Sequence, residues 1–412
     1  MRALFITWPW SSHFYPMAPL GWALRAAGHE VMVASQPSFA PTITGSGLPA
    51  LPAGPDLDIV DQLSEMYRDW RPENDRATVE NSPHRQNGIV SLYRIAKSAE
   101  AMAEEATEFA RQWRPDFVVF EPMAFLGPIL AGALGVPSMR LLWATDSAAK
   151  IARIEDEMLG GLAQRLKADR VNLLGDLTLD PCPPRLRRVH PKVNSAPMRY
   201  IPYNGAAELP PWLRTPPTRP RIVVSWGGSL YRFGWNEGIL APRVVRALAD
   251  QDVEVVVAVH EEYREMFTDL PENVVHVGPV ALHLLLPSCA AIVHQGGAGT
   301  TMTAMSCGTP QFVVPWWPDA IVNARQVEAT GSGRHLWPVG LEDATLKEAL
   351  SRFVADLPSY QRAAMRLRDE HVALPTPAEV VAGFERDSAA GTGAWAARKP
   401  TFSSSRGSSS RG

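Results

Sequence analysis

The chain has 412 residues, with 40 Lys and Arg against 43 Asp and Glu, and a formal net charge of −3. The length suggests two or three domains, and 46% hydrophobic with 20% charged residues is an ordinary globular composition. The balanced charge argues against a nucleic-acid-binding protein and a polybasic membrane anchor. The cysteines, Cys182, Cys289 and Cys307, form no CxxC pair, so neither a disulfide scaffold nor a structural zinc site is indicated.

Two apolar stretches bear on membrane targeting. The apolar run within residues 1–6 breaks at Pro9 and is too short for a signal peptide. The longest apolar stretch, 117–137, is interrupted by an acid, prolines and several glycines, so it is unsuited to crossing a bilayer. We therefore expect a soluble protein of the cytoplasm without a membrane partner.

Short apolar runs alternate with helical segments along the first half of the chain. The run 3–7 has the composition of a strand inside a parallel sheet. The helix after it has Pro16 in its first turn and Gly28 at its end. Further elements are predicted at 31–34 (strand), 93–113 (helix) and 117–120 (strand). This alternation predicts an open, doubly wound α/β sheet.

A proline-rich break separates the two halves. Five prolines fall within residues 203–220, which suits a stiff linker better than a helix or an inner strand. The alternation then restarts, with a helix predicted near 243–249 and strands at 221–225, 253–259, 274–277, 291–294 and 312–315. We predict two Rossmann-like α/β domains, 1–202 and 221–386, that face a cleft between them. Residues 387–412 repeat Ser-Ser-Ser-Arg-Gly and are expected to be a disordered tail.

The most specific motif is His-Gln-Gly-Gly-Ala-Gly-Thr-Thr at 294–301, directly after a predicted strand and before a helix that ends at Gly308. Glycines at such a turn let backbone N–H groups approach a ligand, and a helix N-terminus adds about half a positive charge. We predict a phosphate site to which His294, Thr300 and Thr301 add donors. The GGxG spacing matches neither a Walker A loop nor GxGxxG. The alternative is a tight turn whose glycines serve only packing.

His13 and Glu121 each follow a predicted strand, at the sheet edge where α/β proteins place ligands. A histidine that faces the cleft is suited to removing a proton near neutral pH. A carboxylate beside it would hold its tautomer and stabilise the imidazolium. The alternatives are a surface histidine and an ordinary loop acid.

Asp319 follows the predicted strand 312–315, in the sequence Trp-Trp-Pro-Asp-Ala. An acid at the end of a strand can accept hydrogen bonds from sugar hydroxyls or pair with an amine. The neighbouring tryptophans fit packing at an interface equally well.

These motifs form an ordered series that extends to about residue 386. The chain resembles family 1 inverting glycosyltransferases of the two-domain GT-B fold, and among them the actinobacterial enzymes that attach deoxysugars to macrolides and aromatic polyketides. The segments that carry the resemblance are 12–16, 140–146, 198–205, 221–224, 285–289, 294–300, 308–311 and 375–381.

The resemblance implies a role for each candidate residue. His13 would be the general base that deprotonates the acceptor hydroxyl, and Glu121, where Asp is commoner, would be its acidic partner. Asp319 would bind sugar hydroxyls. Pro279 stands where many relatives have an aromatic residue that stacks on the nucleobase, and Val280 would meet the base edge through its backbone. The diphosphate and sugar would contact Gly227, Ser229, His294, Gly296, Gly297, Ala298, Gly299 and Thr300.

The acceptor site is expected in the loops of the first domain. An apolar pocket for a flat or macrocyclic aglycone would be lined by Phe14, Tyr15, Trp143 and Met158, which fit the core equally well. Residues 61–92 are polar and irregular, as in a mobile lid. The polar and aromatic residues that suggest this lid are Arg68, Trp70, Asn74, Asn81, His84 and Asn87.

The expected donor is a dTDP-activated deoxysugar. Many relatives that use fully hydroxylated sugars have Gln after the acid, whereas Ala320 follows Asp319 here, so a hydrogen-bond partner is missing. The resemblance implies inverting attack by an oxygen, or alternatively a carbon, of the acceptor. The Asp-x-Asp sequences 56–58 and 250–252 do not adjoin the phosphate motif, so we expect neither a metal nor another cofactor.

Partners and alternatives follow from the same resemblance. Besides the donor and a hydrophobic natural-product acceptor, it leaves open a cytochrome-P450-like activator and a second copy in a homodimer. A GT-B-like nucleotide-sugar epimerase and a non-catalytic helper subunit remain as alternative functions. The presence of both His13 and the 294–300 loop favours a transferase.

Overall fold

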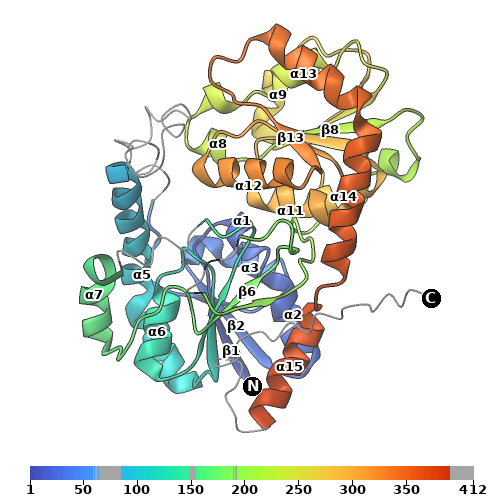
Figure 1. Ribbon diagram of the computed structural model, residues 1–412. Coiled ribbons are helices and arrows are strands. Elements are labelled where there is room, and N and C mark those ends of the chain that lie inside the picture. Colours follow the sequence, from blue (N-terminus) through green and yellow to red (C-terminus); the bar gives the residue numbers. More distant parts are fainter. Residues whose placement is uncertain are drawn as a thin grey trace, which may run out of the picture.

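The computed structural model describes residues 1–58, 60, 64, 85–147, 155–188, 190 and 193–389. These residues form two α/β lobes, which lie one above the other in Figure 1. The lower lobe is built on a seven-stranded sheet of order β3-β2-β1-β4-β5-β6-β7, and the upper lobe on a six-stranded sheet of order β10-β9-β8-β11-β12-β13. Every strand pair in both sheets is parallel.

The strands of both sheets are short. Those of the first sheet are β1 (Arg2–Ile6), β2 (Glu30–Ser35), β3 (Ala50–Pro52), β4 (Phe117–Phe120), β5 (Ser138–Leu141), β6 (Leu177–Asp180) and β7 (Ser195–Pro197). Those of the second sheet are β8 (Arg221–Trp226), β9 (Glu254–Val259), β10 (Val274–Gly278), β11 (Ala291–His294), β12 (Gln311–Val313) and β13 (Gly333–His335). The central strands β4, β8 and β11 are buried at every position, as expected where helices cover both faces of a parallel sheet.

Helices connect the strands and cover both faces of each sheet. In the first lobe they are α1 (Ser11–Phe14), α2 (Ala18–Ala26), α3 (Ala40–Thr44), α5 (Arg85–Trp113), α6 (Leu126–Leu134) and α7 (Glu155–Leu166). The remaining helices are α8 (Ser229–Arg232), α9 (Ala241–Ala247), α10 (Leu282–Leu285), α11 (Ala298–Cys307), α12 (Pro318–Ala329), α13 (Asp343–Ala355), α14 (Leu357–Val372) and α15 (Pro377–Ala389). The predicted helix stops at Gly28 and Gly308 are present, and both glycines have positive φ.

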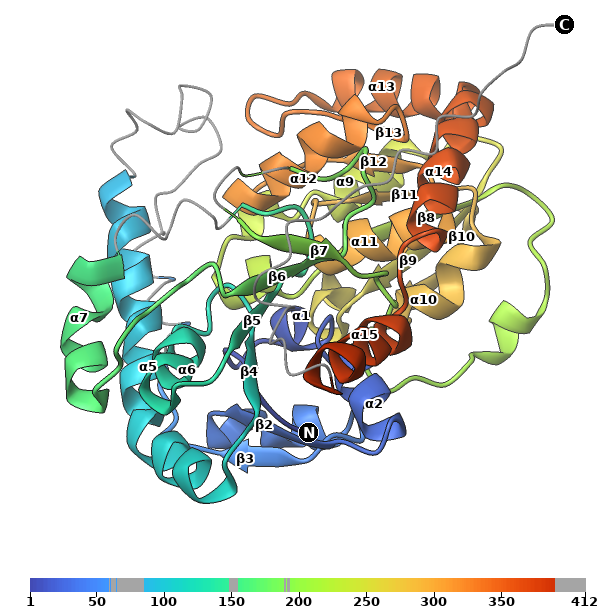
Figure 2. The same cartoon turned by 60° about the horizontal axis from the view of Figure 1, so that its bottom comes forward.

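The last helix returns to the first lobe. α14 runs down from the upper lobe, and α15 then lies beside α2 in both views (Figures 1 and 2). Val381 and Phe384 of α15 are buried in the same apolar cluster as Ala3 and Phe5 of β1. The sequence division assigned residues 377–386 to the second domain, but the apolar face of α15 packs on the first sheet.

Part of the predicted lid and tail falls outside the described residues. Residues 61–63, 65–84 and 390–412 are not described, and they include the predicted lid residues Arg68, Trp70, Asn74, Asn81 and His84. Asn87 lies in α5, which begins at Arg85, where the prediction had an irregular segment. Among the helices of the described ranges, none has the length and apolar character that a bilayer-spanning helix needs.

Phe384 tests whether α15 stabilises the first lobe. Its side chain is 6% exposed and its ring meets that of Phe117 edge-on, with centroids 6.2 Å apart. We expect Phe384→Ala to lower the free energy of unfolding by about 3–5 kcal/mol, as large-to-small changes in a core do. Arg386→Ala, an exposed position of the same helix, should change it by less than about 0.5 kcal/mol. Equal effects in urea unfolding would contradict the packing role.

Candidate active site

Four loops at the carboxyl ends of central strands form the candidate site. In each sheet the strand order reverses beside the first strand, between β1 and β4 and between β8 and β11, and ligands of α/β proteins bind at such points. His13 follows β1 and Glu121 follows β4, whereas Gly227 follows β8 and the glycine-rich loop follows β11. Figure 1 shows α1, which contains His13, directly below α11 and α12 of the upper lobe.

The structure brings His13 and Glu121 together. Nδ1 of His13 lies 3.2 Å from Oε2 of Glu121, and the His13 side chain is 16% exposed. The angle at Nδ1 does not meet that of a hydrogen bond, although the distance is short. Catalytic hydrogen bonds often become aligned only when substrate binds. Because Nδ1 faces the carboxylate, Nε2 is the nitrogen left for a substrate.

Glu121 is completely buried, and the backbone around it supplies its partners. Oε1 accepts a hydrogen bond of 3.0 Å from the Trp8 N–H, and Oε2 accepts one of 2.8 Å from the Met123 N–H. Hydrogen bonds to an ionised carboxylate are about twice as strong as neutral ones, which offsets part of the cost of burial. The longer arm of Glu therefore does not keep the carboxylate from His13.

Two indole rings flank the imidazole of His13. The Trp143 ring stacks on it with centroids 4.1 Å apart and an interplanar angle of 29°. The Trp8 ring is tilted by 49° at 5.3 Å. Both tryptophans are less than 9% exposed, so the packing leaves the imidazole little freedom to turn.

The residues predicted to line the acceptor pocket lie in different surroundings. Phe14 is fully buried in the core of the first lobe, because successive residues of α1 point in different directions and Phe14 faces the sheet. Tyr15 meets the Tyr203 ring edge-on at 4.9 Å, on the linker side. Met158 is buried against α5 and α6 residues in the core. Trp143 reaches the site, but its ring face is covered by His13. For Phe14 and Met158 the burial supports the alternative, a place in the core, whereas a role of Tyr15 and Trp143 in acceptor binding stays a prediction.

The glycine-rich loop forms the start of α11. Gly297 is the N-cap, and no side chain caps the helix, so its first N–H groups lack intrahelical acceptors. Gly296 has φ +88°, and a Cβ there would lie 2.9 Å from the Ala320 carbonyl oxygen, so only glycine fits. At Gly299 a Cβ would meet nothing within 4 Å. The first N–H groups of α11 therefore lack acceptors within the helix, and the space beside Gly299 is open; phosphate binding here stays a prediction.

The His294 ring has a different role from the predicted one. It is fully buried, its Nε2 lies 3.0 Å from Oε1 of Gln311, and its Nδ1 accepts a 3.1 Å hydrogen bond from the Gly296 N–H. Burial lowers the pKa of His294 to about 4, so the ring is neutral. With both nitrogens occupied, the ring shapes the loop and offers no donor to a phosphate. Thr301 is also buried, whereas Thr300 is half-buried at the start of α11.

The loop after β8 lies against this glycine-rich loop. A Cβ on Gly227 would lie 2.9 Å from Nε2 of Gln295. Tyr263 holds the loop, because its hydroxyl donates a 2.8 Å hydrogen bond to the Gly227 carbonyl oxygen. Ser229, half-buried, begins α8. Val280 is half-buried farther along the same sheet edge, after β10.

Asp319 is the acid that the second lobe presents to the first. It lies in the first turn of α12 and is half-buried. Burial raises the pKa of the Asp319 carboxyl, and the charge of His13 acts in the opposite direction. The two residues come from different lobes and lie close enough for their charges to interact.

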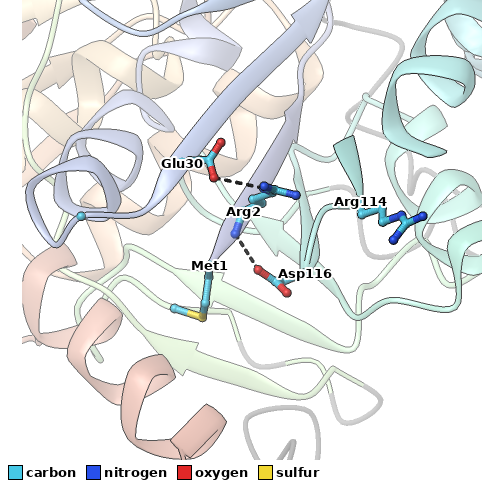
Figure 3. Close-up of a pocket in the computed structure, with 6 residues that line it drawn as sticks. Met1, Arg2, Glu30, Arg114 and Asp116 are labelled. Carbon is cyan, nitrogen blue, oxygen red and sulfur yellow. Dashed lines mark hydrogen bonds and ion pairs between the residues drawn. The ribbon is translucent and has the colours of Figure 1, made fainter. Parts of the chain in front are cut away.

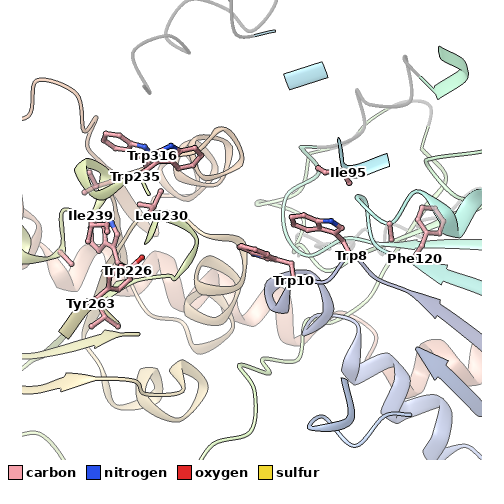
Figure 4. Packing of buried hydrophobic residues seen from close by; sticks show 14 of the residues in the cluster. Trp8, Trp10, Ile95, Phe120, Trp226, Leu230, Trp235, Ile239, Tyr263 and Trp316 are labelled. Carbon is pink, nitrogen blue, oxygen red and sulfur yellow. The ribbon is translucent and has the colours of Figure 1, made fainter. Parts of the chain in front are cut away.

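An aromatic contact that the sequence did not predict joins the two lobes. The Trp10 ring stacks on Trp8 at 5.4 Å and on Phe233 of the second lobe at 5.8 Å. The Arg232 guanidinium lies 5.2 Å above the Trp10 ring. Figure 4 shows Trp10 between the buried rings of the two lobes. The aromatic residues clustered in 8–15 and 226–235 were the signal for this contact.

A polar recess lies at the opposite edge of the first sheet. Its lining includes Arg2, Glu30, Arg114 and Asp116, at the amino ends of the strands (Figure 3). Nε of Arg2 pairs with Glu30 at 3.0 Å, and the Arg2 N–H donates to Asp116 at 2.6 Å. It lies at the edge of the sheet opposite to the one that carries His13, so it does not contribute to the site. Within the described ranges, no three His, Cys, Asp or Glu side chains cluster as metal ligands.

Comparisons with known proteins agree with this arrangement. The chain matches the family described as erythromycin biosynthesis protein CIII-like, the N-terminal domain over residues 22–227 and the C-terminal domain over 242–386. It is 35% identical to the 10-deoxymethynolide desosaminyltransferase of Streptomyces venezuelae, over 94% of this chain and 97% of that protein. It is 34% identical to the TDP-daunosamine transferase DnrS of Streptomyces peucetius, over 94% and 96%. The structure of the glycosyltransferase VinC in complex with dTDP superposes with a TM-score of 0.77 at 34% identity, over 95% and 100%.

The buried His294 makes stability depend on pH. Its pKa falls from 6.5 to about 4 on folding, so between these values the unfolded chain binds a proton that the folded chain excludes. His294 therefore leaves the free energy of unfolding at its highest value above pH 6.5 and lowers it as the pH falls toward 4. The buried His371 acts in the same direction, with its pKa lowered to about 4.

We expect His294→Gln to weaken the pH dependence of the unfolding free energy by up to about 1.4 kcal/mol per pH unit below pH 6.5. The measurement is urea unfolding of both proteins from pH 5 to 7.5. Parallel curves would show that His294 is not buried as a neutral ring.

Proposed function

Because the chain belongs to the erythromycin biosynthesis protein CIII-like family of glycosyltransferases, we propose that it transfers a deoxysugar from a dTDP-sugar to a hydroxyl of a polyketide-type aglycone, with inversion and with His13 as general base. The observation that carries this proposal is the position of His13. Its Nδ1 lies 3.2 Å from Glu121, its charge interacts with that of Asp319 in the other lobe, and its helix α1 lies directly below α11 and α12 (Figure 1).

The proton transfer follows from the geometry at His13. Nε2 takes the proton of the acceptor hydroxyl as its oxygen attacks the anomeric carbon. The imidazolium that forms is stabilised by the Glu121 carboxylate, 3.2 Å from Nδ1. Two backbone N–H groups also donate hydrogen bonds to this carboxylate and hold it in place. Such general base catalysis typically contributes about 10²–10⁴-fold to the rate.

The leaving diphosphate is assigned to the start of α11. The N–H groups of Ala298, Gly299 and Thr300 and the positive end of the ten-residue helix α11 would meet its growing charge. These dipoles are already oriented by the turn at Gly296 and by the His294 ring. The loop at Gly227 and Ser229 would cover the diphosphate and the sugar, and Val280 would lie at the nucleobase.

The donor assignment rests on relatives and on one side chain. The names of the two relatives above specify transfer of desosamine and of TDP-activated daunosamine, and VinC binds dTDP. Ala320, which follows Asp319, is buried and offers no hydrogen bond to a sugar hydroxyl. A deoxysugar without the hydroxyl that a Gln at position 320 would bind should therefore bind about as well here as a sugar that has it.

We propose that no metal takes part. Asp56 of the first Asp-x-Asp sequence accepts a 2.9 Å hydrogen bond from the Ser38 N–H, and Asp250 of the second pairs with Lys347. The diphosphate charge is then met by helix dipoles alone. Turnover that persists unchanged in EDTA is the expected result, and loss that Mg²⁺ restores would contradict it.

His13→Ala tests the catalytic assignment. We expect kcat to fall by about 10²–10⁴-fold while the Kd for dTDP stays within about twofold, since His13 belongs to the lobe that does not hold the diphosphate. Assays would use a panel of dTDP-deoxysugars and polyketide aglycones, with and without a cytochrome-P450-like protein, the activator that the resemblance leaves open. His29→Ala is a matched control, because His29 also contacts a glutamate, Glu385 at 3.1 Å, but lies outside the cleft. Unchanged turnover in His13→Ala would favour a different base.

Gly299→Ala tests the diphosphate site. A Cβ added at Gly299 would meet nothing within 4 Å in the folded chain, so the free energy of unfolding should stay unchanged. The same methyl group would obstruct a phosphate that approaches the backbone. We expect the Kd for dTDP to rise by about tenfold or more, which corresponds to about 1.4 kcal/mol. Gly160→Ala is the control, because a Cβ added at Gly160 would also meet nothing within 4 Å, in a helix remote from the proposed site.

A second experiment identifies the nucleotide. Thermal stabilisation of the protein is measured with dTDP, UDP, GDP, NAD and ATP, and we expect dTDP to stabilise it most. Preference for UDP would overturn the deoxysugar assignment.

A further inference from the structure

Trp143 contacts His13 and also belongs to the interface between the lobes. It lies in the loop after β5, is 8% exposed, and stacks on the His13 ring at 4.1 Å. Its apolar cluster also contains Ala298, Met302 and Met305 of α11. Ala298 is part of the glycine-rich loop. Trp143 therefore contacts the proposed base directly and shares an apolar cluster with the proposed phosphate-binding helix.

A buried ion pair fixes the loop that carries Trp143. An Arg140 guanidinium nitrogen lies 2.7 Å from Oδ2 of Asp146, and the two side chains are 1% and 5% exposed. Nε of Arg140 also donates to the Thr178 hydroxyl on the neighbouring strand β6, at 3.1 Å. The ion pair closes the loop 141–145 between its partners. Such a pair is costly to break because it leaves a buried charge unpaired, so the loop has one position.

The Glu121 contact alone does not set the orientation of the His13 ring. A single contact at Nδ1 lets the ring turn about that point, and its angle is not that of a hydrogen bond. The indole stacked on it at 4.1 Å, with an interplanar angle of 29°, restricts rotation, because turning the imidazole would drive its edge into the indole. The indole face also attracts the cation that forms when His13 takes a proton.

We propose that Trp143 is a positioning residue for the transfer reaction. It holds the His13 ring with Nδ1 toward Glu121 and Nε2 toward the acceptor, and its packing with α11 sets the distance between the base and the diphosphate site. This inference rests on His13 as the general base. It differs from an acceptor-binding role, in which an aglycone would cover the face that His13 occupies.

Substitution at position 143 separates the aromatic face from the volume of the side chain. We expect Trp143→Ala to lower kcat by about 10²-fold, the cost of a misplacement of about 1 Å, with the KM for the acceptor and the Kd for dTDP within about threefold. Trp143→Phe keeps a flat face and should recover most of the rate. Trp143→Leu keeps an apolar side chain without that face and should resemble Trp143→Ala. Trp22→Phe is the control, since Trp22 meets Tyr203 edge-on at 5.0 Å, outside the cleft.

A double-mutant cycle shows whether Trp143 acts through His13. In a His13→Ala background, Trp143→Ala should cost little further rate, because the base that it positions is gone. The same 10²-fold loss in both backgrounds would overturn the proposal, as would a raised acceptor KM with unchanged kcat, which would indicate an aglycone wall. If Trp143→Ala does not fold, the Phe and Leu variants still decide the question. Unchanged turnover in His13→Ala itself would instead refute the base assignment.

Discussion

All strands of both sheets run parallel, so each sheet places the carboxyl ends of its strands at one edge, and the two edges face each other. The contact that holds them in this position is apolar: Trp143 and its neighbours in the first lobe share a cluster with three residues of α11. α14 and α15 reinforce it by carrying the chain back onto the first sheet. The proposed base and the proposed diphosphate site therefore belong to one framework, although they come from different sheets.

The site contains two buried ionisable side chains, Glu121 and His294, and the protein stabilises them in different ways. Glu121 is fully buried beside His13, with two backbone N–H donors that compensate its charge. His294 is also fully buried, but burial lowers its pKa to about 4, and it stays neutral between Gln311 and the Gly296 N–H. The first arrangement holds a carboxylate next to the proposed base. The second fixes the backbone turn that precedes α11, the proposed diphosphate-binding helix, whose dipole already supplies positive potential.

The strands near the start of each lobe and the glycine-rich loop were predictable, because short apolar runs and glycine turns are local features. Within the site, His13 and Glu121 meet as expected, since both follow central strands of one parallel sheet. The role of the His294 ring was mispredicted, because its nearest partner, Gln311, comes from the adjacent strand. Phe14 was mispredicted too: one position along α1 from His13, it faces the core instead of the cleft.

Sequence alone determined the two-domain α/β class, the GT-B resemblance, and the strand ends at which chemistry takes place, because these depend on local composition and on spacing along the chain. Only the tertiary structure shows that α15 packs on the first lobe and that Trp143 covers one face of the His13 ring. It also shows that the rings of Trp10 and Phe233 stack between the lobes, with centroids 5.8 Å apart. Such contacts join residues hundreds of positions apart. They depend on the packing of side chains in three dimensions, which the order of residues in the chain does not show directly.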